Sequence, residues 1–125
     1  MKVYILDNGG SGLDKIVTWL SKDTGIKEIS VISRADEFLK KVKREYPELV
    51  FIRLGNDEIQ GLETGRAVKQ VKSDIRIVFI SEENDHALDA YEVGANGYLL
   101  CPIEKKKFDS ILSKAKQETI VTMKV

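Results

Sequence analysis

Five short apolar runs, each followed by a stretch with helical periodicity, constrain the fold of this 125-residue chain more than any other feature. The runs are apolar on successive residues and rich in β-branched side chains, which is typical of strands buried on both faces. Such strands, alternating with helices, predict a single α/β domain in which a doubly wound parallel sheet lies between two layers of helices. The expected strands cover residues 2–6, 28–32, 49–54, 75–80 and 97–100.

The segments between the strands carry apolar residues at the spacing of amphipathic helices. In the first segment, Leu13, Ile16 and Leu20 fall at i, i+3 and i+7. The second helix is expected to begin after an N-cap at Ser33 and to end before Pro47. The remaining helices are expected over residues 61–73, 85–94 and 104–117.

A further β-type run follows the last expected helix, where a fold of five strand–helix units is already complete. Four successive residues of the run 119–124 are β-branched, and such residues favour strands over helices. We therefore expect an extended segment that pairs with the sheet or with another copy of the chain. The domain is expected to cover residues 1–117, with 118–125 as an extended tail or as the start of a linker or output domain.

Composition excludes several classes of protein. The 20 basic and 20 acidic residues give a net charge of zero, which argues against binding nucleic acid in bulk, and 42% hydrophobic residues argue against disorder. A single cysteine and a single histidine, His86, exclude a disulfide framework and the usual cysteine or histidine metal sites. His86 is expected on the exposed face of the fourth helix. No apolar run approaches the length of a membrane span, and the cysteine usage favours a cytoplasmic protein.

Polar residues at the ends of the strands mark the candidate site, because ligands of open α/β sheets bind at the carboxyl edge. Asp7 ends the first strand and precedes a glycine-rich loop, residues 8–12, which either cradles a phosphate or forms a simple turn. Arg53 ends the third strand, and a buried arginine requires a carboxylate partner, for which Asp7 is the candidate. Ser81 and Cys101 follow the fourth and fifth strands.

Several of these segments occur together in a known family. Residues 47–53 (PELVFIR), the pair Ile80-Ser81 and residues 87–103 (ALDAYEVGANGYLLCPI) strongly resemble the receiver domain of bacterial two-component response regulators. The likeness covers about residues 1–117, and the run 87–103 is most similar to the receivers of LytTR-type transcription regulators. This resemblance implies a flavodoxin-like fold with five parallel strands and a cis peptide bond between Cys101 and Pro102.

The resemblance also implies a phosphorylation site, from which this chain departs at three positions. The phosphoacceptor aspartate of the family is Arg53 here, the second acid of its metal-binding pair is Asn8, and its phosphate-contacting lysine is Cys101. A guanidinium cannot attack a phosphoryl group as a carboxylate does. The expected pocket of this degenerate site comprises Asp7, Asn8, Arg53, Gly55, Ser81 and Cys101.

Other positions of the site match the family. Ser81 and Tyr98 correspond to its switch hydroxyl and its switch aromatic residue, and Asp7 corresponds to its first acid. Asp7 alone is a weak candidate for binding a divalent cation, because Mg²⁺ usually requires more than one carboxylate. We therefore expect no catalytic residue and no cofactor, with Mg²⁺ binding lost or very weak.

The expected function is that of an atypical receiver domain that acts in signal transduction or transcription regulation without phosphorylation. It would be a module for protein–protein contacts and not an enzyme. The expected contact surface is the fourth helix, fifth strand and fifth helix, residues 85–117, which would bind a protein partner or a second copy.

Three alternatives remain open from the sequence. The chain could be the regulatory part of a LytTR-type transcription factor, in which case DNA would be bound only by an output domain outside these residues. It could be a flavodoxin-like protein that binds a nucleotide or flavin through the glycine-rich loop. It could also be a receiver that still binds a divalent ion through Asp7.

Overall fold

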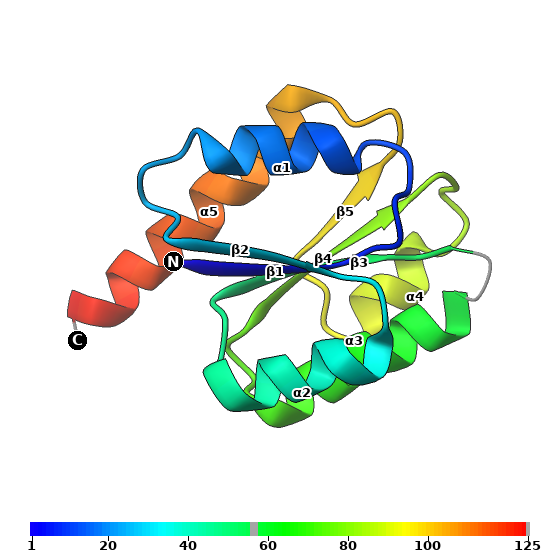
Figure 1. Cartoon of the computed structure of the whole chain (residues 1–125), viewed down its shortest axis with the longest axis horizontal. Coiled ribbons are helices and arrows are strands. Elements are labelled where there is room, and N and C mark those ends of the chain that lie inside the picture. The colour runs from blue at the N-terminus through cyan, green and yellow to red at the C-terminus, as the bar shows by residue number, and fades with distance from the viewer. Residues whose placement is uncertain (56–57, 125) are drawn as a thin grey trace.

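The computed structural model describes residues 1–55 and 58–124, and shows five parallel strands in the order β2-β1-β3-β4-β5. Helices α1 and α5 cover one face of the sheet, while α2, α3 and α4 cover the other (Figure 1). This arrangement confirms the predicted doubly wound, flavodoxin-like fold. The strands are β1 (Lys2–Leu6), β2 (Glu28–Ile32), β3 (Leu49–Arg53), β4 (Arg76–Ser81) and β5 (Gly97–Leu100).

The apolar strand residues divide between two cores, one on each side of the sheet. Along β1, Val3 and Ile5 pack into the core beneath α1 and α5, whereas Tyr4 and Leu6 pack into the core beneath the opposite helices. A strand covered on both faces needs apolar side chains at every position, because successive side chains point to opposite faces. The uninterrupted apolar runs in the sequence are therefore a direct consequence of the three-layer architecture.

The helices lie in the expected segments, but several of their ends differ from the expected residues. The N-cap of α2 is Arg34 and not Ser33, and no side chain caps this helix. The expected N-cap at Ser33 is therefore wrong; two acids in the first turn, Asp36 and Glu37, instead complement the helix dipole. The helices are α1 (Leu13–Ser21), α2 (Ala35–Glu45), α3 (Glu58–Val71), α4 (Ala87–Glu92) and α5 (Lys105–Lys124).

Helix α3 begins three residues before Gly61, which had been expected to open it. Gly61 lies inside the helix because the helix packs closely on the end of β3 there. A Cβ atom at this position would lie 2.6 Å from Leu54 Cδ2. The glycine thus permits close packing between α3 and the segment after β3, and does not mark a turn.

The predicted extended segment over residues 119–124 is wrong, because α5 is one continuous helix from Lys105 to Lys124. β-branched residues disfavour a helix by less than about 0.7 kcal/mol each. A helix that is already formed gains a hydrogen bond with each added residue, without a second nucleation cost. Extension of α5 therefore outweighs the local preference of this run for a strand.

The amino-terminal part of α5 is docked firmly on the sheet. Phe108 lies in the core between Trp19 and Phe51, with ring centroids 5.1 and 6.0 Å away. Lys116 of α5 forms an ion pair with Asp23 in the loop between α1 and β2. None of the helices in the described part of the chain has both the length and the apolar character needed to cross a membrane.

The Asp23–Lys116 pair predicts a loss of stability in acid. Hydrogen bonds from Lys116 and from the Gly25 amide lower the pKa of the Asp23 carboxyl below its ordinary value. Its ionised form therefore stabilises the fold above the unfolded-state pKa of about 3.9, and this contribution is lost as the pH falls through the folded-state pKa. In urea titrations from pH 6 to pH 2.5, Asp23→Asn should lower the stability at pH 6 and make it depend less steeply on pH. An unchanged acid slope would contradict this assignment.

Candidate functional site

A polar cleft of about 590 Å³ opens at the carboxyl ends of the central strands. The residues lining it come from the loop after β1, the end of β3 and the loop between β4 and α4. Their side chains are mostly charged or polar, as expected for the ligand-binding edge of such a sheet. The lining residues are Asp7, Asn8, Gly10, Arg53, Leu54, Gly55, Ser81, Glu82, Glu83 and His86.

A buried ion pair between Arg53 and Asp7 dominates one wall of this cleft. Arg53 Nε and Nη2 donate hydrogen bonds of 3.0 and 2.9 Å to the same carboxylate oxygen, Asp7 Oδ2. The Gly10 amide donates a 2.9 Å bond to the other oxygen, Asp7 Oδ1. The Asp7 side chain is only 1% exposed and that of Arg53 is 12% exposed. The structure thus confirms the expected pairing, in which both carboxylate oxygens already accept hydrogen bonds.

The charge of Arg53 is fixed by this environment. Burial alone would disfavour the charged guanidinium, but the hydrogen bonds to Asp7 and the attraction of its carboxylate outweigh burial and raise the pKa of Arg53 above its ordinary value. Arginine is protonated at physiological pH even in water. The site therefore contains a permanent positive charge directly beside its buried carboxylate.

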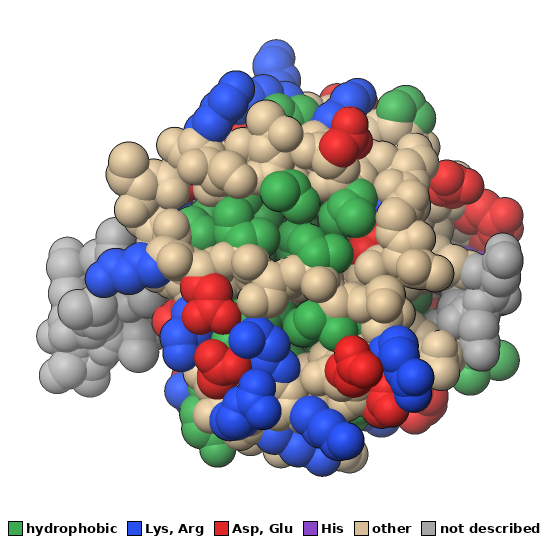
Figure 2. All heavy atoms as spheres, in the orientation of Figure 1, with side chains coloured by type: hydrophobic (Ala, Val, Ile, Leu, Met, Phe, Trp, Pro, Cys, Tyr) green, Lys and Arg blue, Asp and Glu red, His purple; other side chains and the backbone are tan. Residues whose placement is uncertain are grey.

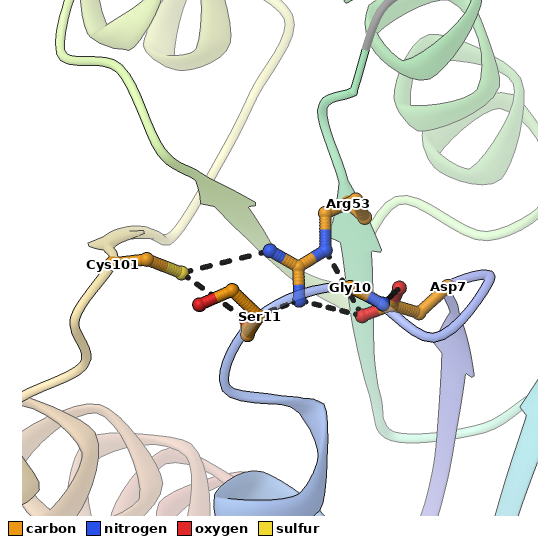
Figure 3. Close-up of polar contacts among 5 residues, drawn as sticks. All are labelled: Asp7, Gly10, Ser11, Arg53 and Cys101. Carbon is orange, nitrogen blue, oxygen red and sulfur yellow. Dashed lines mark hydrogen bonds and ion pairs between the residues drawn. The ribbon is translucent and has the colours of Figure 1, made fainter.

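The guanidinium also ties the loop before α1 to the end of β5 (Figure 3). Arg53 Nη2 donates a 2.6 Å hydrogen bond to the Ser11 carbonyl oxygen, and Nη1 lies 3.6 Å from Cys101 Sγ. The Cys101 thiol donates to the same Ser11 carbonyl, at 3.4 Å. Arg53 therefore joins three strand ends, those of β1, β3 and β5, through a single side chain.

Gly10 makes room for the guanidinium. A Cβ atom at this position would lie 2.4 Å from Arg53 Nε and 2.5 Å from Cζ, far inside van der Waals contact. The glycine-rich loop thus accommodates a cation lying against its backbone. The alternative in which this loop cradles a phosphate is disfavoured, because the Gly10 amide is bonded to Asp7 and the guanidinium lies against it.

The two expected switch residues, Ser81 and Tyr98, both contact the loop between β4 and α4. Ser81 is buried, and its Oγ accepts a 3.0 Å hydrogen bond from the Glu83 amide. Tyr98 Oη donates a 2.5 Å hydrogen bond to the Glu83 carbonyl oxygen, while its ring packs against the core beneath α3 and α4. Burial of the hydroxyl, together with the nearby carboxylates of Asp85 and Glu83, raises the pKa of Tyr98 despite its hydrogen bond to Ser81.

The structure brings together most of the expected site. Asp7, Asn8, Arg53, Gly55 and Ser81 line the cleft, and Cys101 contacts the guanidinium of Arg53. The expected pocket did not include Gly10 and Ser11, although their loop was a candidate, and it did not include Glu82 or Glu83. His86 was expected on the exposed face of the fourth helix, which is wrong: it is half-buried, precedes α4 and lines the cleft. Its position just after β4 was the one signal that could have placed it there.

The Mg²⁺ that the family resemblance implies does not fit the residues present. Among residues 1–55 and 58–124, no group of three or more acidic, histidine or cysteine side chains could hold a metal ion. Both oxygens of Asp7 accept hydrogen bonds, and a guanidinium lies 2.9 Å from one of them. A dication would have to displace that charge or bind beside it, on a single carboxylate whose two oxygens are already hydrogen-bonded.

Comparison with known proteins decides the family. The model of the response regulator receiver domain matches residues 3–113. The chain belongs to the response regulator receiver domain family. This is a family of signalling domains and not of enzymes, and its members interact with other proteins. The expected cis bond between Cys101 and Pro102 is confirmed as well.

Curated relatives of this receiver domain include two-component regulators that are about twice as long. The sensory transduction protein LytT of Bacillus anthracis is 27% identical over 121 residues, covering 94% of this chain and 48% of the relative. The transcriptional regulatory protein LytR of Staphylococcus aureus is 22% identical over 116 residues, covering 93% and 47%. This receiver domain thus spans about half the length of the curated relatives it matches.

Solved structures show the same receiver fold. The response regulatory domain of protein mrkE from Klebsiella pneumoniae has a TM-score of 0.81 at 21% identity, covering 94% of this chain and 97% of that one. A two-component response regulator from Clostridium difficile has a TM-score of 0.80 at 19% identity, covering 95% and 98%.

Proposed function

We propose that this receiver domain signals without being phosphorylated. The observation that carries the proposal is the ion pair between Arg53 and Asp7, because the family resemblance places the phosphoacceptor aspartate at position 53. A guanidinium offers no carboxylate oxygen to accept a phosphoryl group. The positive charge also stands where a receiver would bind its metal ion, so Arg53 replaces the metal as the counterion of Asp7.

The changes at the other two positions of the pocket support the same conclusion. Asn8 brings no charge to the loop after β1, and Cys101 brings none to the end of β5. The Cys101 side chain contacts Arg53 and the Ser11 carbonyl instead. We infer that the conformation is held by Arg53 itself, and that no phosphate is needed to set the positions of Ser81 and Tyr98.

We propose that the output surface consists of residues 85–117, which comprise α4, β5 and the part of α5 up to Gln117. Three large apolar side chains are exposed on α4 and β5: Leu88, Tyr91 and Leu100, with Leu88 73% exposed. The same surface carries acidic residues on α4 and lysines at the start of α5, and so has charges of both signs. A protein partner or a second copy would bury these side chains.

The lengths of the relatives favour a regulatory role within a larger protein. We propose residues 1–117 as the receiver-like domain and residues 118–125 as the start of a connection to an output domain, as in LytTR-type transcription regulators. Any contact with DNA would then be made outside these 125 residues. We propose a cytoplasmic location, which the presence of a single cysteine favours.

A phosphodonor experiment tests the proposal directly. Incubation with acetyl phosphate or phosphoramidate and 10-fold excess Mg²⁺ should leave the mass unchanged by intact-protein mass spectrometry. The melting temperature should also stay unchanged, because no acyl phosphate forms and Mg²⁺ finds one carboxylate beside a fixed cation. A receiver domain with an aspartate at the corresponding position serves as the positive control.

Two outcomes would overturn the proposal. One is an increase in the mass of the chain by one phosphoryl group. If this increase is kept in the Arg53→Ala variant and lost when Asp7 is also replaced, the phosphoryl group is on Asp7. The other is Mg²⁺ binding at micromolar affinity by calorimetry, which would show that Arg53 leaves the pocket. The variant Arg53→Asp should regain Mg²⁺ affinity but remain a poor phosphoacceptor, because Asn8 and Cys101 are unchanged.

A further inference from the structure

A second cavity lies between α5 and the amino ends of β3 and β4, at the opposite end of these strands from the cleft that contains Arg53. Its volume of about 270 Å³ is close to the lower end of the range for small-molecule sites in proteins. Part of its lining is apolar, and all three elements contribute to that part. The apolar lining residues are Leu49, Val78, Ile111 and Ala115.

Two cationic side chains line this cavity from opposite elements. Arg76 begins β4, and the alternation of side chains along that strand places it on the same face as Val78, toward α5. Lys114 of α5 is exposed and forms no ion pair with the described side chains. No carboxylate is among the described residues that line the cavity. The charges that these residues present to it are therefore positive.

The basic side chains of α2 have a different environment. Figure 2 shows basic and acidic side chains interleaved in the lower part of the view, where α2 lies in Figure 1. On this helix, Lys41 and Arg44 both pair with the carboxylate of Glu45, at 2.9 and 3.5 Å. Such groups compensate each other's charge within the chain. The cavity beside α5 differs, because its cationic lining contains no acidic side chain of the described residues.

The side-chain amide of Asn96 adds a neutral donor to this lining. Asn96 Oδ1 accepts hydrogen bonds of 2.9 Å from the Ile77 amide and of 3.2 Å from Lys69 Nζ. Because both partners are donors, the oxygen must be the atom that faces them, and the NH₂ group lies on the other side of the amide. The described residues offer that NH₂ group no acceptor, so its N–H donors remain for a ligand. Lys69 also brings a third positive charge close to the cavity.

We propose that this cavity binds a small organic anion, in which a carboxylate is joined to a short apolar group. Arg76, Lys114 and the Asn96 NH₂ group would donate to the carboxylate oxygens, since a guanidinium matches the two oxygens of a carboxylate. The apolar group would lie against Ile111 and Ala115. A free carboxylic acid and the carboxyl terminus of another protein chain both offer this chemistry. The bound anion would tie α5 to the sheet, and the proposal does not rest on either function proposed above.

Isothermal titration calorimetry of the whole chain with N-acetyl-leucine and with 4-methylpentanoate tests this site. At least one of the two acids should bind with a Kd below about 1 mM. N-acetyl-leucinamide has the same apolar group but no charge, and should bind at least about tenfold more weakly than N-acetyl-leucine. Equal or tighter binding of N-acetyl-leucine supports a chain terminus as the natural ligand, whereas tighter binding of 4-methylpentanoate supports a free acid.

Three variants assign the binding to this cavity. Asn96→Asp can still accept the hydrogen bonds from Ile77 and Lys69, but it replaces the NH₂ group with an oxygen that repels an anion. It should weaken binding of the acids at least about tenfold. Lys114→Gln should weaken it at least about threefold. Lys106→Gln, which makes the same change of charge at an exposed position eight residues earlier on α5, should leave it unchanged.

Far-UV circular dichroism and thermal unfolding establish that each variant is folded. In ¹⁵N spectra of the wild-type chain, the amide shifts caused by the bound acid should be largest around Asn96, Ile111 and Lys114. The proposal is overturned if neither acid binds at about 10 mM, or if N-acetyl-leucinamide binds as tightly as N-acetyl-leucine. It is also overturned if Asn96→Asp binds the acids as the wild type does, or if Lys106→Gln weakens binding as much as Lys114→Gln.

Discussion

Replacing Arg53 with alanine should lower the free energy of unfolding by about 2–4 kcal/mol, the largest loss expected from any single change in the cleft. The reason is that Asp7, whose side chain is 1% exposed, would keep its charge without its two hydrogen bonds from the guanidinium. The loss should fall short of the highest values for buried pairs, because the adjoining cleft lets water reach the carboxylate. Urea or thermal unfolding of the purified variant measures it.

A double-mutant cycle separates the ion pair from simple loss of packing. In the Asp7→Asn background, Arg53→Ala removes a cation that has no carboxylate partner. The double variant should therefore be at least about 1 kcal/mol more stable than the sum of the two single losses predicts. Strictly additive losses would show that the two side chains contribute independently, and that the guanidinium does not serve as the counterion.

Gly10→Ala should cost about 1–3 kcal/mol, a large effect for one methyl group in a surface loop. The methyl group would lie 2.4 Å from Arg53 Nε, so the guanidinium must leave its position beside Asp7. The strain is one of space and not of backbone conformation, because Gly10 does not have a positive φ, unlike Gly9 and Gly12. Chemical denaturation measures the loss.

Two controls make the Gly10→Ala result specific. Gly55→Ala, in the same cleft, should be neutral or slightly stabilising, because no atom lies within 4 Å of its added Cβ and alanine restricts the unfolded chain. In the Arg53→Ala background, Gly10→Ala should also become neutral or slightly stabilising. If it remains equally costly there, the loop requires glycine for a reason other than the guanidinium.

The fold was predictable from the sequence because the two-sided burial of the strands leaves a strong pattern. β1, β2 and β5 begin and end at the expected residues, β3 ends one residue early, and β4 is shifted by one residue. Helix ends were less predictable, since they depend on contacts between elements. Gly61 looks like a helix boundary in the sequence, yet it lies inside α3 because Leu54 packs against it.

The candidate site was predictable only in part, and the reason is geometric. A charged residue ending an apolar strand requires a partner at the same edge of the sheet, which was enough to pair Arg53 with Asp7. The contacts of Arg53 with the Ser11 carbonyl and with the face of Gly10 involve backbone atoms. Contacts with backbone atoms do not restrict the residue type, except where they require a glycine. A glycine in the sequence is not specific evidence of such a contact, because glycine is also common in ordinary turns. His86 was misplaced because its cleft exists only once the loops after β3 and β4 come together.

The continuity of α5 has a mechanical consequence. Its packed part holds Phe108, Leu112 and Ala115 in the core, while the helix runs on to Lys124 and beyond the sheet (Figure 1). The seven residues after Gln117 carry the axis about 10 Å outward at 1.5 Å per residue. A rigid rod anchored at one end acts as a lever, so a tilt of a few degrees at Phe108 is converted into a larger sideways displacement at Lys124. A movement of the packed part of α5 against the sheet would therefore displace its carboxyl-terminal end sideways, although the helix itself would not change its conformation.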